Sequence, residues 1–396
     1  MIHQINRRDF LQQSMTSAAA LYAWHLTPFM PQDLNVQNVQ PEDTGKILWV
    51  ETAGSAFEIG SQYGEKLGNL LINNIENSLK RLKKRFESAP MEKAYRVMLD
   101  VLEHDFPYLV EEMRGMAAGA KVEFKEIALS NLSAGFGAFV KQNEGCSNII
   151  FPQSDHGPIL GKTLDGSTPE SDIAVVRLIR PQQGYTVLCE TRINGISTET
   201  GINDKGLAVG ESSIHFRTIN PRGIIRNILP RLLLQECANV EEGIQFLSRY
   251  PVLRYGFHFA LVDKAGNAAI VERSPTEMYV RRAEGKTIFC TNHTATPCMR
   301  KLELSRGPVG DKNSDERYAN LQRITSSSDF KLNLDTMKDI LRNHRVPGGI
   351  CQHGELEMYT RRAYLIILNE GKLLVAPGPA CRHKFQEFRL QGNERK

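Results

Sequence analysis

Apolar residues in the first third of the chain recur at helical spacing. Between residues 56 and 86 they fall three or four positions apart, as at Ile59, Tyr63, Leu67 and Leu71, which is the pattern of an amphipathic helix. The predicted elements of this part are a short strand at 47–51 and helices at 56–86, 92–102 and 107–120. We therefore predict a mostly helical region that ends near residue 140.

The pattern changes at Cys146, where short β-rich runs alternate with turn signals such as Asp155-His156-Gly157. Strands are predicted at 147–151, 158–163, 173–179, 186–190, 207–209, 257–262, 268–272, 361–368 and 372–375, and helices at 223–234, 240–249 and 333–342. Runs of strands, then helices, then strands indicate antiparallel sheets covered by helices, an α+β layered architecture.

The charge of the chain is nearly balanced. It has 49 basic and 45 acidic residues, a formal net charge of +4. So small an excess favours neither a nucleic-acid partner nor an acidic substrate. The basic run at 80–85 is interpreted as the solvated face of a helix.

The first 30 residues differ from the rest. Arg7 and Arg8 precede the apolar pair Phe10 and Leu11, and a mildly hydrophobic stretch runs over 15–24. This pattern is typical of a twin-arginine export signal, and it is shorter than the about 20 apolar residues of a membrane span. We predict export to the periplasm, with 31–46 as a linker; a basic leader without a signal function is the alternative.

The seven cysteines show no zinc-finger spacing. An odd count in an exported protein leaves at least one free thiol. Cys351 and His353 form a pair that suits a metal, but nothing in the sequence indicates the other two ligands of a closed zinc site. We therefore interpret this pair as structural and predict neither a metal nor a cofactor.

Common catalytic signatures are absent from the sequence, and Gly145-Cys146-Ser147 stands out at the junction of the two patterns. Cys146 could be a buried small hydrophobic residue. If the Gly145–Cys146 bond were cut, however, an α-amine with a pKa of about 7.7–8.0 would lie beside the thiol. That amine can take the thiol proton, so no histidine base is needed. Gly145 would allow the strained backbone that self-cleavage requires.

Several motifs occur in one order along roughly residues 47–390. They are Glu58-Ile59-Gly60-x-x-x-Gly64, Glu112-Met113-Arg114-Gly115-Met116-Ala117-Ala118-Gly119-Ala120, Gly145-Cys146-Ser147, Leu160-Gly161-Lys162-Thr163-Leu164-Asp165, Gly201-Ile202-Asn203-Asp204-Lys205-Gly206, Thr291-Asn292-His293, Ser314-x-x-Arg317, Ile350-Cys351-x-His353 and Gly378-Pro379-Ala380-Cys381. In this set the chain resembles the acyl-coenzyme A:6-aminopenicillanic acid acyltransferase family, relatives of penicillin V acylases and bile-salt hydrolases among the N-terminal-nucleophile hydrolases.

The resemblance implies roles for three residues near the junction. Cys146 matches the nucleophile, and Asp165 matches an aspartate that faces its amine and can stabilise the protonated form. Without the resemblance, Asp165 is equally a turn residue. Lys162 stands where relatives carry an arginine, so it keeps the charge without the planar fork.

The resemblance also assigns Asn292 and Arg317. Asn292 matches the asparagine that donates to the oxyanion, and Arg317 an arginine near the nucleophile. The alternatives are an ordinary loop asparagine and a surface helix arginine. A second oxyanion group is expected near Ser212 or Ser213. His293 could instead form a Cys–His pair with Cys146.

The fold that the resemblance implies is a four-layer αββα sandwich. We expect a signal at 1–30, a small fragment over 31–145 that stays associated with a large fragment over 146–396, and acyl transfer through a thioester on Cys146. The substrate would be a small amide or acyl donor, linear or lactam-bearing. The alternative is a binding protein that keeps the fold without cutting itself.

Overall fold

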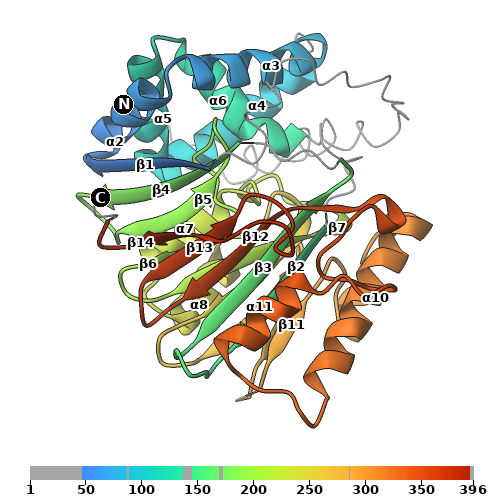
Figure 1. Ribbon diagram of the computed structural model, residues 1–396. Helices are drawn as coiled ribbons and strands as arrows, with labels where there is room; N and C mark the ends of the chain where they lie inside the picture. The colour runs from blue at the N-terminus through green and yellow to red at the C-terminus, as the bar shows by residue number, and fades with distance from the viewer. Residues whose placement is uncertain (1–46, 87–88, 137–144, 169–172, 285, 393–396) are drawn as a thin grey trace.

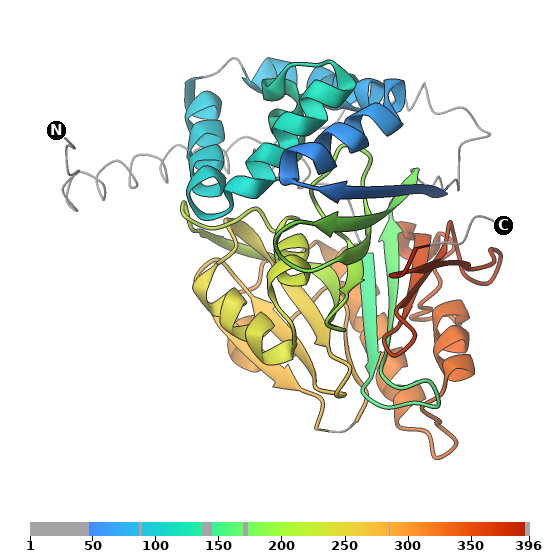
Figure 2. The ribbon, with the colours of Figure 1, turned by 90° about the vertical axis from the view of Figure 1, so that its left-hand side faces the viewer.

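The computed structural model describes residues 47–86, 89–136, 145–168, 173–284 and 286–392. Two β-sheets pack face to face, and helices cover the outer side of each (Figures 1 and 2). This confirms the predicted α+β, four-layer αββα architecture. The predicted leader and linker at 1–46 lie outside the described residues. None of the helices in the described part of the chain combines the length and apolar character that a bilayer crossing requires.

The larger sheet, sheet A, has eight strands. In spatial order they are β1 (Ile47–Gly54), β4 (Ala174–Pro181), β5 (Val187–Thr191), β6 (Thr200–Asn203), β7 (Ala208–Ile219), β8 (Arg254–Val262), β9 (Ala268–Arg273) and β10 (Met278–Arg282). All neighbours are antiparallel except β1 and β4. The prediction of purely antiparallel sheets is therefore wrong at this edge. A parallel pair needs a long crossover, and here the chain passes through five helices and two strands of the other sheet.

The smaller sheet, sheet B, has six antiparallel strands. In spatial order they are β11 (Ile288–Cys290), β2 (Gly145–Phe151), β3 (Ile159–Gly166), β12 (Tyr359–Ile367), β13 (Lys372–Ala376) and β14 (Gln386–Arg389). Alternate residues of a strand point to opposite faces. Cys146 and Ile150 of β2 accordingly pack between the two sheets, while Ile149 and Phe151 face the outer helices.

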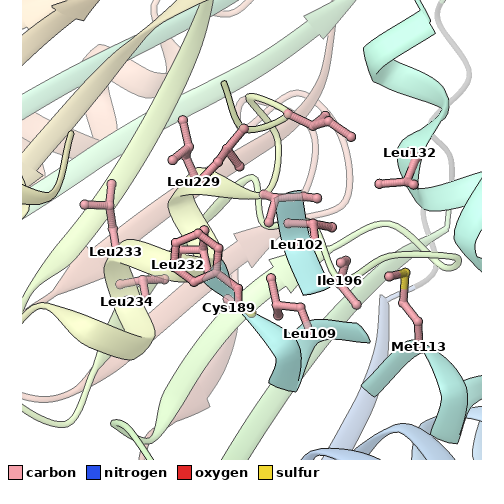
Figure 3. Close-up of a cluster of buried hydrophobic side chains, with 14 of the residues drawn as sticks. Leu102, Leu109, Met113, Leu132, Cys189, Ile196, Leu229, Leu232, Leu233 and Leu234 are labelled. Atoms are coloured by element: carbon pink, nitrogen blue, oxygen red, sulfur yellow. The ribbon is translucent and has the colours of Figure 1, made fainter. Parts of the chain in front are cut away.

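Seven of the helices cover sheet A. They are α2 (Ala56–Leu67), α3 (Asn69–Phe86), α4 (Ala89–Asp105), α5 (Pro107–Ala120), α6 (Phe124–Leu132), α7 (Leu229–Glu236) and α8 (Val240–Arg249). Their shared core joins leucines of α4, α5 and α7 to Cys189 of β5 (Figure 3). Sheet B is covered by α10 (Pro308–Thr325) and α11 (Leu334–Arg342). The short helical segments α9 (Pro297–Arg300), η3 (Ser133–Phe136) and η4 (Glu355–Glu357) lie in connections.

Glycines allow α2 and α5 to pack in backbone contact. A Cβ on Gly60 would lie 1.9 Å from the carbonyl oxygen of Glu112, and one on Gly119 would lie 2.1 Å from that of Ser61. No side chain fits at such distances. The two glycine-containing motifs noted before the junction are thus the two sides of one helix contact.

Two predicted helices differ in the structure. The helix predicted over 56–86 divides at Gly68, whose positive φ of 48° ends α2. The helix predicted over 223–234 begins only at Leu229, because the preceding segment forms turns and a bridge between Ile224 and Val252. Strands β6, β10, β11 and β14 and helices α6 and α10 were not predicted at all.

Candidate active site

Cys146 is the second residue of β2, between β11 and β3. Its side chain packs on the inner face of sheet B and is 3% exposed. Gly145 pairs with Asp165 of β3 in the regular ladder of sheet B. The strained backbone that Gly145 would allow during a cut stays a prediction. A Cβ on Gly145 would lie 2.5 Å from Met358 Cε and 3.1 Å from Asp165 Cβ. A side chain at this position would displace the end of the Met358 side chain and press on Asp165.

The backbone of Cys146 is held at both of its polar groups. Its N–H donates to Asn292 Oδ1 at 2.8 Å, and its carbonyl oxygen accepts from Arg317 Nη1 at 2.6 Å. Asn292 follows shortly after the end of β11, and β11 pairs with β2. This pairing places Asn292 next to Cys146. The structure therefore brings three of the predicted site residues into direct contact.

Arg317 lies on α10 and is completely buried, so the alternative of a surface arginine is wrong. Besides Cys146 it contacts Ser147 Oγ at 2.9 Å and Asn292 Oδ1 at 2.8 Å. Its Nε donates to Asn313 Oδ1 at 2.9 Å, one helical turn earlier. Burial lowers the pKa of Arg317, against the opposing charge of Asp165. The guanidinium thus places a positive charge against the backbone of Cys146.

Asp165 is a buried residue of β3 and not the turn residue of the alternative interpretation. Its Oδ1 accepts from Thr360 Oγ1 at 2.7 Å. Burial raises the pKa of this carboxyl group to about 6, although Arg317 acts in the other direction. Its Oδ2 would lie 3.2 Å from a Cβ on Gly145. The carboxyl group therefore stands beside the Gly145–Cys146 peptide bond, on the face of sheet B opposite the thiol.

Lys162 is fully buried between the sheets. Its Nζ donates to Glu211 Oε1 at 2.7 Å and to the carbonyl oxygen of Glu199 at 2.9 Å. Burial disfavours the charged form, but Glu211, Cys146 and Glu199 outweigh it and raise the pKa of Lys162. Lys162 is thus paired with carboxylates, and it acts on the thiol through its charge.

The thiol of Cys146 is protonated in this environment. Burial and then Glu211 raise its pKa well above the ordinary value, and Lys162 offsets only part of this. Burial also raises the pKa of Glu211 to about 8. A neutral thiol is a poor nucleophile, so its proton must pass to a base for any reaction.

The side-chain amide of Asn292 has its oxygen toward Cys146 in the uncut chain. Its Nδ2 donates to the carbonyl oxygen and, at 3.3 Å, to the Oγ of Ser213. Ser212 instead donates to the carbonyl oxygen of Thr291. Of the two serines named for a second oxyanion group, Ser213 is the one that contacts Asn292.

His293 lies on the α10 side of the site. Its Nδ1 is 2.8 Å from Ser314 Oγ and 3.2 Å from Asp315 Oδ1, and its ring packs against Tyr318. Burial and then Arg300 lower its pKa to about 3. A group that holds a proton only below about pH 3 is ill suited to exchange one near neutrality.

Sequence reasoning missed the residues that support the site. Arg317 and Asn292 are held by α10, through Asn313 and through Ser314, whose Oγ accepts from the N–H of Asn292 at 2.8 Å. Thr360 holds Asp165, and Glu199 and Glu211 hold Lys162. The motif Ser314-x-x-Arg317 was the available signal, since three positions are one helical turn and place both side chains near one face.

Comparisons with known proteins show the family of the chain. The sequence model of the acyl-coenzyme A:6-aminopenicillanic acid acyl-transferase family matches residues 153–351, half of the chain. The chain is 24% identical over 292 residues to the 40 kDa form of the acyl-coenzyme A:6-aminopenicillanic-acid-acyltransferase of Emericella nidulans. The aligned region covers 72% of this chain and 78% of that protein. It is 30% identical over 220 residues to the beta-alanyl-dopamine/carcinine hydrolase of Drosophila melanogaster. Here the aligned region covers 50% of this chain and 56% of that protein.

Solved structures that resemble the chain include two hydrolases. Penicillin V acylase from Agrobacterium tumefaciens has 16% identity and a TM-score of 0.39, over 62% of this chain and 86% of that one. A mutant conjugated bile acid hydrolase from Clostridium perfringens has 14% identity and a TM-score of 0.40, over 63% of this chain and 95% of that one. On the family match, the chain belongs to the acyl-coenzyme A:6-aminopenicillanic acid acyl-transferase family, a family of acyltransferases and amidases.

Proposed function

We propose that this enzyme cuts itself between Gly145 and Cys146 and then transfers or hydrolyses the acyl group of a small amide through a thioester on Cys146. The observation that carries the proposal is the fixation of Cys146 N by Asn292 and of Cys146 O by Arg317. Asp165 stands beside the bond to be cut. A buried cysteine with a packing role needs none of these groups.

Self-cleavage would follow from this geometry in two steps. The Cys146 sulfur adds to the Gly145 carbonyl carbon, the C–N bond breaks, and the thiol proton ends on the departing nitrogen. Water then hydrolyses the thioester, which leaves a carboxylate on Gly145 and a free amine and thiol on Cys146. Asp165 lies beside the same peptide bond on the opposite face of sheet B, where its carboxyl group can stabilise the protonated form of the new amine.

Turnover of an amide would use the new α-amine as the base. An α-amine has a pKa of about 7.7–8.0, so a fair fraction of it is unprotonated near neutral pH and can take the thiol proton as the sulfur attacks. Asn292 Oδ1, which accepts from Cys146 N in the uncut chain, would go on orienting that amine. Asn292 Nδ2, on the Ser213 side, is the donor that we assign to the oxyanion.

The substrate class rests on the relatives. One is named for transfer of an acyl group to 6-aminopenicillanic acid, and another for hydrolysis of beta-alanyl-dopamine and carcinine. We therefore propose a small linear or lactam-bearing amide as the substrate. Attack of water on the thioester gives hydrolysis, and attack of an amine gives transfer; hydrolysis is the reaction we favour.

The two fragments would stay together after the cut. Glu112 of the small fragment accepts from Arg177 at 2.8 Å and from Arg231 at 3.3 Å, both in the large fragment, and all three side chains are buried. Residues 50–132 and 173–271 also share one hydrophobic core. Breaking the peptide at residue 145 removes none of these contacts.

Intact mass after expression tests self-cleavage. The parent is expected to give two masses that divide at residues 145 and 146, and Cys146→Ala a single uncut chain. Cys298→Ala is the matched control, because Cys298 is an exposed free thiol, and it should be cut like the parent. A parent that stays in one piece would instead support a binding protein with this fold.

Kinetics of two neighbouring variants test the choice of base. After a mass check of cleavage, Asn292→Ala should lower kcat on a chromogenic anilide by roughly 10²–10³, the usual loss for one oxyanion donor. His293→Ala should retain most of the activity, with a controlling pKa near that of an α-amine, about 7.7–8.0. A cleaved and folded His293→Ala enzyme without activity, with Asn292→Ala active, would point to a Cys–His pair.

We also propose export through the twin-arginine route, because of Arg7 and Arg8 in the leader. Replacement of both by lysine should hold the protein in the cytoplasm, since the receptor reads the arginine pair. Cell fractionation of the two forms measures this. Equal periplasmic delivery of the lysine form would contradict the assignment of residues 1–30.

A further inference from the structure

Four side chains with metal-binding atoms lie together at one corner of sheet B, away from Cys146. His344 follows α11, Cys351 and His353 lie in the segment before β12, and Cys381 lies between β13 and β14. We call His344, Cys351, His353 and Cys381 the thiol–imidazole cluster. The sequence offered only the pair Cys351 and His353, so the view that further ligands are lacking is wrong. Cys381 and His344 come to this pair through the fold.

The distances among Cys351, Cys381 and His353 match those between ligands of one metal ion, and His344 lies close to His353 and Cys381. Cys351 Sγ and Cys381 Sγ are 3.6 Å apart, and His353 Nε2 lies 3.6 Å from the first and 3.2 Å from the second. Ligand atoms of His344, His353 and Cys381 all lie within 4.8 Å of one another. In a tetrahedral zinc site with Zn–S of about 2.3 Å and Zn–N of about 2.0–2.1 Å, the ligand atoms are about 3.5–3.8 Å apart.

The hydrogen bond of His344 fixes which of its nitrogens can bind a metal. His344 Nδ1 lies 3.0 Å from the carbonyl oxygen of Arg342. A carbonyl oxygen only accepts, so Nδ1 carries the hydrogen and Nε2 keeps its lone pair. Histidines that bind metals are commonly held in this way by a backbone carbonyl.

The cluster is packed on one side and open on the other. Cys351 is buried in the structure. His344 is exposed and lines a cavity together with Lys312, Val346 and Gly349. An ion can therefore enter beside His344, and a metal cation would stabilise the thiolate that burial disfavours.

We propose that His344, Cys351, His353 and Cys381 bind one Zn²⁺ ion in a closed Cys₂His₂ site. On binding, the two thiols release two protons and the sulfurs become thiolates, which neutralise the charge of the ion. Four protein ligands leave no open position for a substrate, so the site is structural. This inference does not depend on the proposed function.

The site would support the active site through the residue between two of its ligands. Gln352 donates its backbone N–H to Thr360 Oγ1 at 2.8 Å, and Thr360 Oγ1 donates to Asp165. The side-chain oxygen of Gln352 accepts from Asn313 Nδ2 at 2.8 Å, and Asn313 holds Arg317. A metal that fixes Cys351 and His353 thus fixes the supports of both Asp165 and Arg317.

The rival state of the cluster is a disulfide between Cys351 and Cys381. Both sulfurs are free thiols in this structure, and 3.6 Å is well beyond an S–S bond of about 2.05 Å. An exported protein meets oxidising conditions, where disulfides form. The experiment must therefore distinguish a bound ion from a covalent link.

The experiment measures metal in the full, untagged chain purified without chelators. Mass spectrometry of elements should find about one zinc per chain in the parent, and Co²⁺ exchanged into the site should give thiolate-to-cobalt absorption. Cys381→Ser should lose both signals, while Cys298→Ser keeps them, because Cys298 lies outside the cluster. Cys351 is buried and its variant could misfold, so the exposed His344→Ala is the second test. The zinc affinity of His344→Ala should fall by about 100-fold or more, because even the loss of a residue that only hydrogen-bonds a ligand typically lowers metal affinity about 10- to 100-fold.

Three outcomes would overturn the proposal. One is a parent without zinc that also fails to bind added Zn²⁺. Another is equal zinc in Cys381→Ser and Cys298→Ser. The third is a peptide that links Cys351 to Cys381 in a non-reducing digest of the protein as purified. None of these results bears on self-cleavage, which is read from the masses of the fragments.

Discussion

Two buried ionic clusters lie at different depths of this fold, and they have opposite charge balances. In the Glu112 cluster, between helices and sheet A, one carboxylate meets two guanidinium groups, Arg177 and Arg231. In the Lys162 cluster, between the two sheets, one buried ammonium group lies 2.7 Å from Glu211 and 3.9 Å from Glu199. Glu199 has a second cation, Arg192, at 3.0 Å, but the Arg192 side chain is 40% exposed. The two clusters therefore differ in the ratio of buried acids to buried bases.

That ratio decides whether a cluster changes charge near neutral pH. Burial would raise the pKa of Glu112, but Arg231 and Arg177 outweigh it and hold the pKa below its ordinary value. Glu211 shares its one cation with Glu199, and burial raises its pKa to about 8. The Glu112 cluster is thus permanently charged and suited to fastening. The Lys162 cluster can titrate, and its charges act on the Cys146 thiol.

The largest effect is expected from Glu112→Ala. It leaves two buried guanidinium groups without their carboxylate, which typically costs about 3–5 kcal/mol of unfolding free energy. Urea unfolding in a Cys146→Ala background, which keeps a single chain, measures this loss. The control Glu241→Ala breaks an exposed pair with Arg282 and should cost no more than about 1 kcal/mol. Equal losses would mean that burial of the Glu112 cluster has no special weight.

Replacement of Lys162 tests the effect of its charge on the thiol, apart from the loss of stability that breaking a buried pair brings. Lys162→Met removes the charge that lowers the pKa of Cys146, and one opposite charge nearby is usually worth about 1–3 pKa units. The thiol should become harder to alkylate, and kcat/KM should fall at least about tenfold, since one pKa unit is a factor of ten. Lys162→Arg keeps the charge and should stay closer to the parent. If the rate of thiol alkylation depended on pH in the same way in Lys162→Met and in the parent, the charge of Lys162 would have no effect on the pKa of Cys146.

The smallest effect is a pH dependence removed by Glu211→Gln. The native state keeps the Glu211 proton up to about pH 8, whereas the unfolded chain loses it near 4.5. The stability from this group is therefore complete below about pH 4.5 and is lost as the pH rises through about 8. The free energy of unfolding should fall less steeply over this window in Glu211→Gln than in the parent. Parallel profiles would show that Glu211 is already ionised in the folded protein.

Local signals were enough to predict some elements. The helices at 107–120 and 240–249 were predicted at their true bounds, because Pro107 marks one start and Asn239 caps the other with a side-chain acceptor. The missed helix α10 has few apolar residues, since its buried face is built of Asn313, Ser314 and Arg317. Polar residues that serve a site give no hydrophobic periodicity to detect.

The candidate site also has residues that the sequence could predict and residues that it could not. Its central residues stood in motifs that a resemblance could match, so Cys146, Asp165, Asn292 and Arg317 could be named before the fold. Glu211 lies 49 positions from Lys162, and the packing of the two sheets brings them together. Thr360 lies 195 positions from Asp165, and the pairing of β12 with β3 brings them together. Cys381 likewise lies 30 positions from Cys351. A single sequence holds no information on such pairings, and the charge state of Glu211 depends on them.

The parallel pairing of β1 with β4 sets a limit on the lifetime of a processed molecule. All eight residues of β1 are paired with β4, from Ile47 to Gly54, and β1 precedes the proposed cut while β4 follows it. The strand is placed while both parts are one chain, when its partner is always close at hand. After the cut, β1 and β4 belong to separate chains. If such a molecule unfolds, the fragment that carries β1 can diffuse away, because no covalent link keeps its effective concentration high. We expect the mature enzyme to persist by slow unfolding rather than by refolding, so its half-life, and not an equilibrium, measures its durability.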